Sequence, residues 1–244
     1  SALPMLALAQ QVDMDKVRAQ PQVNVIQQTP LPGLDEPADE YPGNVQTATD
    51  ADIESSGASN LADFLNRRIP GVSTADVQGS PYQIDLSYRG HRLSPLLGSP
   101  QGLSVYIDGV RVNQPLGDVM DWDLVPEMAI ADMSLIPGSN PLYGLNTLGG
   151  ALVLGTKSGL THPGTEIDAS IGSFGRKRIE FGHGARWSDG WHGYMAGTWF
   201  DENGWRERSP GNLGNLFLKL GRDMGDTAWS LSYTYGRSNL IGNG

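Results

Sequence analysis

The sequence lacks several features that would assign it to a familiar class. It contains no cysteine, which excludes a disulfide scaffold and any zinc or iron–sulfur site with thiolate ligands. It has no run of about 18 apolar residues, which excludes a membrane-spanning helix but not a transmembrane β-strand, whose signature is alternation. Basic residues are few, 17 Lys and Arg against 27 Asp and Glu, and the net charge of −10 argues against a nucleic-acid partner.

The sequence is instead rich in glycine, and its charged residues are unevenly distributed. The 244 residues include 32 glycines without a collagen-like period, and the length suits one or two domains. Residues 1–158 hold 8 basic and 18 acidic side chains, whereas residues 159–244 hold 9 of each. Two segments of different character therefore meet near residues 157–164.

The N-terminal 43 residues have the composition of processing and linker segments. Residues 1–9 (SALPMLALA) are apolar and end in a small-x-small pattern, which predicts the remnant of a secretory signal peptide, with a disordered start as the alternative. Residues 10–43 are rich in Pro, Gln and Asp and predict a flexible arm. We interpret the chain as part of an exported protein.

Residues 44–158 predict a compact mixed α/β domain. A helix capped by Thr49 or Asp50 is expected to end at Ile69, before Pro70-Gly71. Short strands separated by Gly and Pro turns follow. They are predicted at 83–88, 103–107, 110–112, 131–136 and 151–154.

From residue 159 onward the sequence alternates between two faces, as transmembrane β-strands do. In residues 228–235 the odd positions are Trp, Leu, Tyr and Tyr, while the even positions are small and polar. Further strands are predicted in 166–171, 176–187, 191–200 and 213–221, and in the last of these Phe217 breaks the alternation. Aromatic residues near strand ends suit a membrane interface; they are Trp187, Trp191, Trp199, Phe200 and Trp205. A soluble β-sandwich has the same period and remains an alternative.

A series of motifs in the acidic domain resembles the plug domain of TonB-dependent outer-membrane receptors. The motifs run in order along the chain as LADFLNRRIPGV (61–72), YRG (88–90), YIDGV (106–110), PGSNPLYG (137–144) and LNTLGGAL (145–152). The resemblance implies an α+β plug over residues 44–158, followed in 159–244 by antiparallel transmembrane strands, together a fragment of a 22-stranded plugged barrel. One departure is the strand 132–136, which ends in Pro-Gly where the family has Gly-Pro. This departure puts ion pairs carried over at that strand in doubt.

The resemblance implies a transport function and a location in the bacterial outer membrane, in contact with its lipid. The expected activity is TonB-dependent import of a scarce substrate, foremost a ferric siderophore or other iron chelate, including citrate-type chelates, with cobalamin, sugars and peptides as further options. The partners would be the small-molecule chelate and TonB with its inner-membrane energising complex. The alternative from another class is a soluble exported β-rich binding or adhesion domain.

The resemblance also implies which residues bind the substrate and which contact TonB. Two plug loops expected to face outward carry residues that can hydrogen-bond or stack on a chelate, and the arginines suit an anionic one. These residues are Arg89, His91, Arg92, Asn113, Gln114 and Trp122. The TonB contact is predicted in the alternating stretch Gln22, Val23, Asn24, Val25 and Ile26, since an extended segment can add to the edge of a partner's sheet. A disordered linker is the alternative for that stretch.

Searches for catalytic chemistry fail. The segment 150–158 resembles a phosphate loop but has one residue too many before Lys157. The four histidines form no metal-binding pair, and Asp118, Asp121 and Asp123 lack the spacing of a calcium loop. No nucleophile elbow is present. The sequence therefore predicts no enzyme, no cofactor and no metal site.

Overall fold

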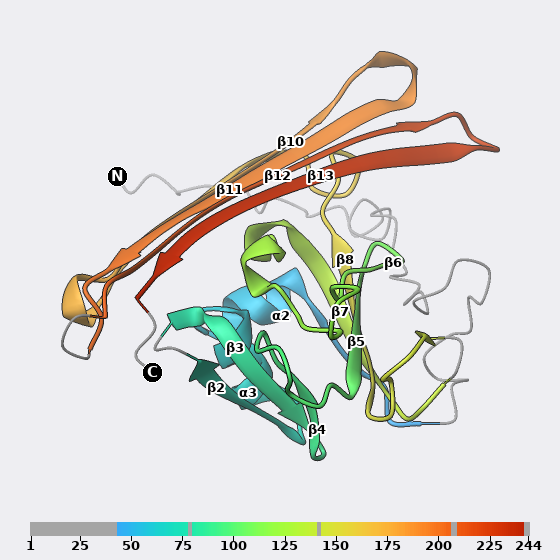
Figure 1. The fold of residues 1–244 in the computed structure, drawn as a ribbon. Coiled ribbons are helices and arrows are strands. Elements are labelled where there is room, and N and C mark those ends of the chain that lie inside the picture. The colour runs from blue at the N-terminus through green and yellow to red at the C-terminus, as the bar shows by residue number, and fades with distance from the viewer. Residues whose placement is uncertain (1–42, 78–79, 141–142, 206–208, 242–244) are drawn as a thin grey trace, which may run out of the picture.

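The computed structural model describes residues 43–77, 80–140, 143–205 and 209–241. It has two parts: a mixed α/β domain, which we call the plug, and a curved antiparallel sheet, which we call the wall (Figure 1). The predicted signal-peptide remnant and the arm lie almost entirely outside the described residues. Within the described residues, no helix has the length and apolar character needed to cross a membrane.

Two short helices stand where the sequence predicts one. Helix α2 (Asp50–Ser55) begins at Thr49, whose hydroxyl accepts from the Asp52 amide while the Asp52 carboxylate accepts from the Thr49 amide, a reciprocal capping box. Helix α3 (Leu61–Arg68) has its own N-cap, Asn60. The single-helix prediction is wrong because Gly57, with a φ of +64°, turns the chain between them.

The central sheet of the plug has the order β1-β7-β8-β5-β6. Four of its strands confirm the predicted ones, and β1, which pairs with β7, was not predicted because four residues carry too little pattern. Strands β5 and β8 are parallel, and the other pairs are antiparallel. The bounds are β1 Gln46–Thr49, β5 Leu103–Ile107, β6 Val110–Arg111, β7 Ile130–Pro137 and β8 Gly150–Thr156.

A second plug sheet and helix α3 enclose the main core. This sheet has the order β2-β3-β4, with β2 at Val72–Val77, β3 at Ser80–Tyr88 and β4 at His91–Leu93. The core combines side chains from α3 and both sheets, among them Leu65, Ile84 and Leu152, all fully buried. This core cluster consists of plug side chains, and their burial against one another stabilises the plug.

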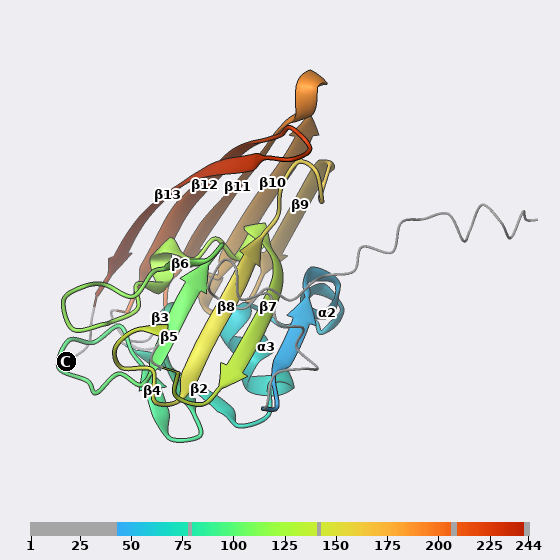
Figure 2. The same ribbon diagram turned by 90° about the vertical axis from the view of Figure 1, so that its right-hand side faces the viewer.

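The wall is a meander of five strands in the order β13-β12-β11-β10-β9. Each strand pairs antiparallel with the next in sequence, which confirms the five strands predicted after residue 159. The strands are β9 Gly164–Ile171, β10 Lys177–Arg186, β11 Trp191–Glu202, β12 Gly211–Asp223 and β13 Ala228–Leu240. They run together over the plug, and Figure 2 shows them behind the plug's central sheet.

The two faces of the wall differ in what covers them. The face away from the plug exposes large apolar side chains such as Ile167, Leu231 and Tyr233. Within the described residues no second sheet covers this face, which speaks against the β-sandwich alternative. Phe217, the residue that breaks the alternation, points inward and is buried against the plug. Phe200 is also buried, so its predicted place among membrane-interface aromatics is wrong.

Candidate functional site: the interface between plug and wall

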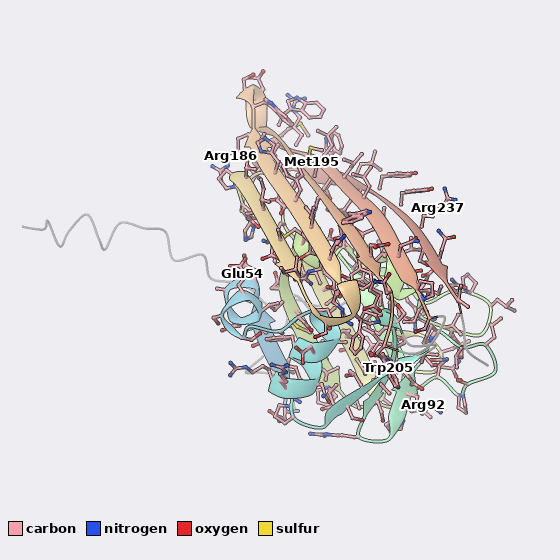
Figure 3. The ribbon with its side chains drawn as sticks, turned by 90° about the vertical axis from the view of Figure 1, so that its left-hand side faces the viewer. Glu54, Arg92, Arg186, Met195, Trp205 and Arg237 are labelled. Carbon is pink, nitrogen blue, oxygen red and sulfur yellow. The ribbon has the colours of Figure 1, made fainter. Side chains whose placement is uncertain are left out.

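The two ends of the wall are distinguished by the connections between its strands. Residues 187–190 and 224–227 make tight turns at one end, which we call the turn end. Longer connections, 172–176 and 203–210, join the strands at the other end, which we call the loop end. In Figure 3, Arg186 marks the turn end, and Trp205 lies at the loop end, toward the same side of the molecule as Arg92 of the plug.

A polar link joins the plug to strand β12. The Lys219 ammonium donates to Asp108 Oδ2 at 2.9 Å and to Thr156 Oγ1 at 2.8 Å. The Asp108 carboxylate also accepts from the Thr156 amide at 2.9 Å and the Thr156 hydroxyl at 2.6 Å. Asp108 reaches this position because it occupies a left-handed conformation in the Asp108-Gly109 hairpin. One wall lysine therefore holds the ends of two central plug strands.

A second polar cluster joins helix α2 to the edge strand β9. The Lys157 side chain is only 3% exposed, and its ammonium lies 2.6 Å from Glu166, 3.8 Å from Asp50 and 4.0 Å from Glu54. A ring nitrogen of His162 lies 2.9 Å from the Asp50 carboxylate. Three carboxylates around one buried ammonium give this cluster a net negative charge, so the lysine is strongly held.

A third cluster lies between η2 (Glu127–Ala129) and strand β10. Arg178 lies 3.6 Å from Glu180 and donates to the backbone oxygen of Ser59. Glu127 accepts from the Leu61 amide at 3.2 Å, at the start of helix α3. Burial, together with the nearby Glu180 carboxylate, raises the pKa of Glu127 to about 8. Its carboxyl is therefore largely protonated at neutral pH.

Apolar contacts alternate with these polar links. Phe217 of β12 packs with Tyr194 and Ala196 of β11 against Ala129 of the plug. Nearer the loop end, Tyr82 of the plug meets the Phe200 ring edge to face at 4.9 Å. Such contacts fix the plug in one orientation on the wall.

A cavity of about 840 Å³ separates helices α2 and α3 from strands β9 and β10. Charged groups of both signs line it, including Lys157, Glu166, Arg178 and Glu180. Among the described residues no group of three or more His, Cys, Asp or Glu side chains is placed to hold a metal ion. The cavity thus has a polar lining without a metal site in the part of the chain that the structure describes.

The predicted substrate residues of the β3–β4 hairpin lie at the surface. Arg89 is exposed, and its guanidinium lies over the Tyr88 ring at 5.1 Å. Arg92 is also exposed but forms an ion pair with Asp85. His91 is half-buried beside Gly102 and Gly149. The Asp85 carboxylate therefore neutralises one of the two arginines predicted to bind an anionic chelate.

The other predicted substrate residues have mainly structural contacts. The Asn113 side chain is buried, accepts from the Val105 amide and donates to the backbone oxygens of Leu103 and Asp118. Trp122 is buried and donates to the Ile84 oxygen at 2.8 Å. Gln114 remains exposed, with its amide 3.4 Å from Asp121. Asn113 and Trp122 thus lack the accessible surface that direct ligand contact requires.

The predicted TonB-contact stretch, residues 22–26, lies outside the described residues. Sequence reasoning also missed the residues that join plug to wall. It identified the Asp108-Gly109 turn but had no signal for Lys219, which is 111 positions away along the chain. A lone lysine on an alternating strand is indistinguishable from a solvated one until the plug is placed against it.

Comparisons with known proteins agree with this architecture. The sequence model of the family described as TonB-dependent Receptor Plug Domain matches residues 37–151. The vitamin B12 transporter BtuB of Vibrio cholerae is 26% identical over 167 residues, which cover 68% of this chain and 26% of that protein. The chain thus spans about a quarter of the length of the curated relatives it matches.

Solved structures share the fold at low sequence identity. The ferric-catecholate import receptor Fiu from E. coli, in its open form, gives a TM-score of 0.68 at 20% identity, covering 88% of this chain and 30% of that one. The ferric citrate transporter FecA gives a TM-score of 0.61 at 21% identity, covering 82% and 32%. The matched proteins are transporters and receptors, which supports the prediction that the chain is not an enzyme.

Proposed function

The chain belongs to the TonB-dependent receptors of the bacterial outer membrane, and from this premise we propose that it takes part in the energy-dependent import of a scarce solute. The observation that carries the proposal is the polar attachment of plug to wall through Asp108, Thr156 and Lys219. A plug held by hydrogen bonds and ion pairs can be released by a pulling force without exposing a large apolar core.

The proposed cargo is a ferric siderophore or another iron chelate. Receptors for ferric catecholates, ferric citrate and pyoverdine are among the structures with this fold. Vitamin B12 is the competing cargo, because the curated relative BtuB is a vitamin B12 transporter. Longer extracellular loops than periplasmic turns are typical of outer-membrane barrels, so the loop end would face outward. Cargo would then reach the plug from the loop end.

The proposed mechanism uses the N-terminal arm as a handle. TonB, energised by its inner-membrane complex, would bind the arm at Gln22–Ile26 by adding a strand to its own sheet. Force on the arm would reach β1 first, since β1 is the first described strand and pairs with β7 alone.

We also propose a division of the chain into four parts. Residues 1–9 are the leader remnant, residues 10–43 are the arm, residues 44–158 are the plug, and residues 159–244 are the first wall strands.

Uptake of radioactive iron tests the proposal in iron-starved cells that carry this receptor as their outer-membrane importer. Cells supplied with ferric siderophores should accumulate iron when TonB is present and should lose uptake, but not surface binding, when it is deleted. Val25→Pro should have the same effect as the deletion because proline removes a strand donor, and Val25→Ala is the matched control. Uptake that persists without TonB would refute the import function, and full uptake by Val25→Pro would refute the assignment of the arm.

A further inference from the structure

The plug is connected to the wall by residues 157–163, which we call the linker. It runs from the end of strand β8 to the start of β9. The His162 amide donates to the Ser158 oxygen at 2.8 Å, and the Ser158 amide donates to the Thr161 hydroxyl at 3.1 Å. The same hydroxyl lies 2.8 Å from Nδ1 of the His162 ring. These hydrogen bonds fold the linker into a compact turn.

The linker backbone lies directly against wall strands β10 and β11. The Arg186 guanidinium, at the end of β10, donates to the backbone oxygens of Gly159 and Leu160. A Cβ at Gly159 would lie 2.1 Å from a backbone oxygen of β10, and a Cβ at Gly184 would lie 1.9 Å from the His162 oxygen. Such a close approach of two backbones requires glycine at both positions. The linker is therefore fixed to the wall along its backbone.

Two side chains of the linker hold helix α2. Nε2 of the His162 ring lies 2.9 Å from Asp50 Oδ2. The Lys157 ammonium lies 3.8 Å from Asp50 and 4.0 Å from Glu54, while Glu166 of β9 lies 2.6 Å from the same ammonium. The linker thus joins the wall through its backbone and helix α2 through its side chains.

Helix α2 depends on contacts of this kind. It has six residues, too few for independent stability in water. Strand β1 precedes it and pairs with β7 alone, and Gly57, with a φ of +64°, separates it from α3. Its Ile53 side chain packs against the plug core. Among the described residues, loss of the linker contacts would leave α2 attached through Ile53 and β1.

The linker and helix α2 lie on the side from which the arm would be pulled. Arg186 is the last residue of β10, at the turn end of the wall, and Figure 3 shows it at the same edge of the molecule as Glu54 of α2. The proposed orientation places the loop end outward and the turn end toward the periplasm. Since α2 starts directly after β1, force on the arm would reach α2 immediately after β1.

We propose that the linker is a clasp, fixed to the wall by Arg186, which holds helix α2 in the docked plug until force on the arm breaks the contacts of Asp50 with His162 and Lys157. This inference rests on the proposed import function. Arg186 and His162 are positioning residues in it, because both act through α2 and not on the cargo. The clasp sets the work needed to free α2, and the linker stays on the wall when α2 moves.

Hydrogen exchange of the native receptor in lipid nanodiscs tests the clasp without an import assay. His162→Ala removes a partner of Asp50 and should accelerate exchange of the α2 amides about tenfold, as expected for one hydrogen bond to a charged group, without changing the β11 amides. His162→Gln keeps a nitrogen donor and should restore most of the protection. His183→Ala is the matched control, because the His183 ring bonds Thr165 within the wall at 2.8 Å.

A substitution at Gly184 tests the attachment of the linker to the wall. The methyl group of Gly184→Ala meets the His162 oxygen and should displace the linker, so that the linker and α2 amides exchange about fivefold faster or more. Gly214→Ala is the control, because a Cβ at Gly214, also on a wall strand, meets nothing within 4 Å. Equal exchange in the two variants would refute the attachment.

Iron uptake at a reduced proton gradient tests the role of the clasp in import. A protonophore is titrated into cells that carry the receptor. At the concentration that halves uptake by wild type, His162→Ala should retain most of its uptake, because less work frees α2. Surface binding of the ferric siderophore should be the same in both. A purely structural defect would instead lower uptake by the variant at every concentration.

The outcomes separate the clasp from the import function. Unchanged α2 exchange in His162→Ala, equal acceleration in α2 and β11, or coincident protonophore titrations would overturn the clasp. Uptake by wild type that persists without TonB would refute import, and the exchange measurements would still decide whether the linker holds α2.

Discussion

The Asp108 carboxylate lies 2.9 Å from the Lys219 ammonium, and this pair joins the central sheet of the plug to the wall. The Lys219 side chain is 11% exposed and that of Asp108 is 24% exposed, and Thr156 shares both partners. The contact depends on a two-residue hairpin in the plug and on an inward-facing position of a wall strand. It therefore reports directly on whether the plug is docked.

Replacing Lys219 should loosen the plug. Lys219→Met leaves the Asp108 carboxylate, whose side chain is 24% exposed, without its cation, which should cost about 1 kcal/mol of docking stability. Limited proteolysis of the native receptor in outer membranes would detect this as faster cleavage within the plug. Lys177→Met is the control, because Lys177 is exposed at the start of β10, at the loop end of the wall and away from Lys219. Equal cleavage of both variants would contradict a docking role for Lys219.

Removing the inward-facing aromatic side chain of β12, Phe217, should weaken the same interface through the loss of apolar packing. Phe217 is 1% exposed, and Phe217→Ala leaves a cavity against Ala129 that should cost about 3–5 kcal/mol. Thermal denaturation should show a clear loss. Leu218→Ala, one position along and facing away from the plug, should change the midpoint little, and a comparable loss in both variants would refute the assignment of faces.

Acidification should strengthen the contact at Glu127. Burial raises the pKa of this carboxyl from 4.5 to about 8, so between these values the folded protein binds more protons than the unfolded chain. The corresponding stability is complete below pH 4.5 and is lost as the pH rises through 8. The melting temperature should therefore increase from about pH 8 to about pH 5, and Glu127→Gln should show a smaller increase.

Other plug carboxyls with raised pKa, such as those of Asp123 and Asp132, are present in both proteins, so the difference between wild type and variant isolates Glu127. Identical pH profiles for the two would show that Glu127 is already ionised in the folded plug.

A methyl group at Gly150 should disrupt the start of β8. Gly150 has a φ of +132°, and a Cβ there would lie 2.1 Å from the Ile136 backbone oxygen. Gly150→Ala should therefore destabilise the plug by more than about 1 kcal/mol, because neither neighbour can yield without breaking the β7–β8 pairing. Gly138→Ala is the comparison, since it also has a positive φ but has open space around its Cβ. Hydrogen exchange of the β8 amides should be faster in Gly150→Ala than in Gly138→Ala.

Local signals were sufficient for most of the fold. Turn residues such as Asp108-Gly109 and the alternation in residues 228–235 depend on neighbouring positions alone, so the corresponding hairpin and wall strands were predicted correctly. The break between α2 and α3 was missed because Gly57 does not by itself interrupt a helical pattern. Strand β1 was missed because it exists by pairing with β7, a long-range contact.

Only the tertiary structure decided which polar residues serve the interface. Phe217 looked like an error in the alternation until Ala129 was placed against it, and Lys219 looked like a solvated lysine until Asp108 reached it. The sequence by itself determined the plug and the wall, because backbone conformation and hydrophobic pattern are local properties. The pairing of Asp108 with Lys219 was set by the tertiary structure, because two residues separated by 111 positions have no local sequence signature.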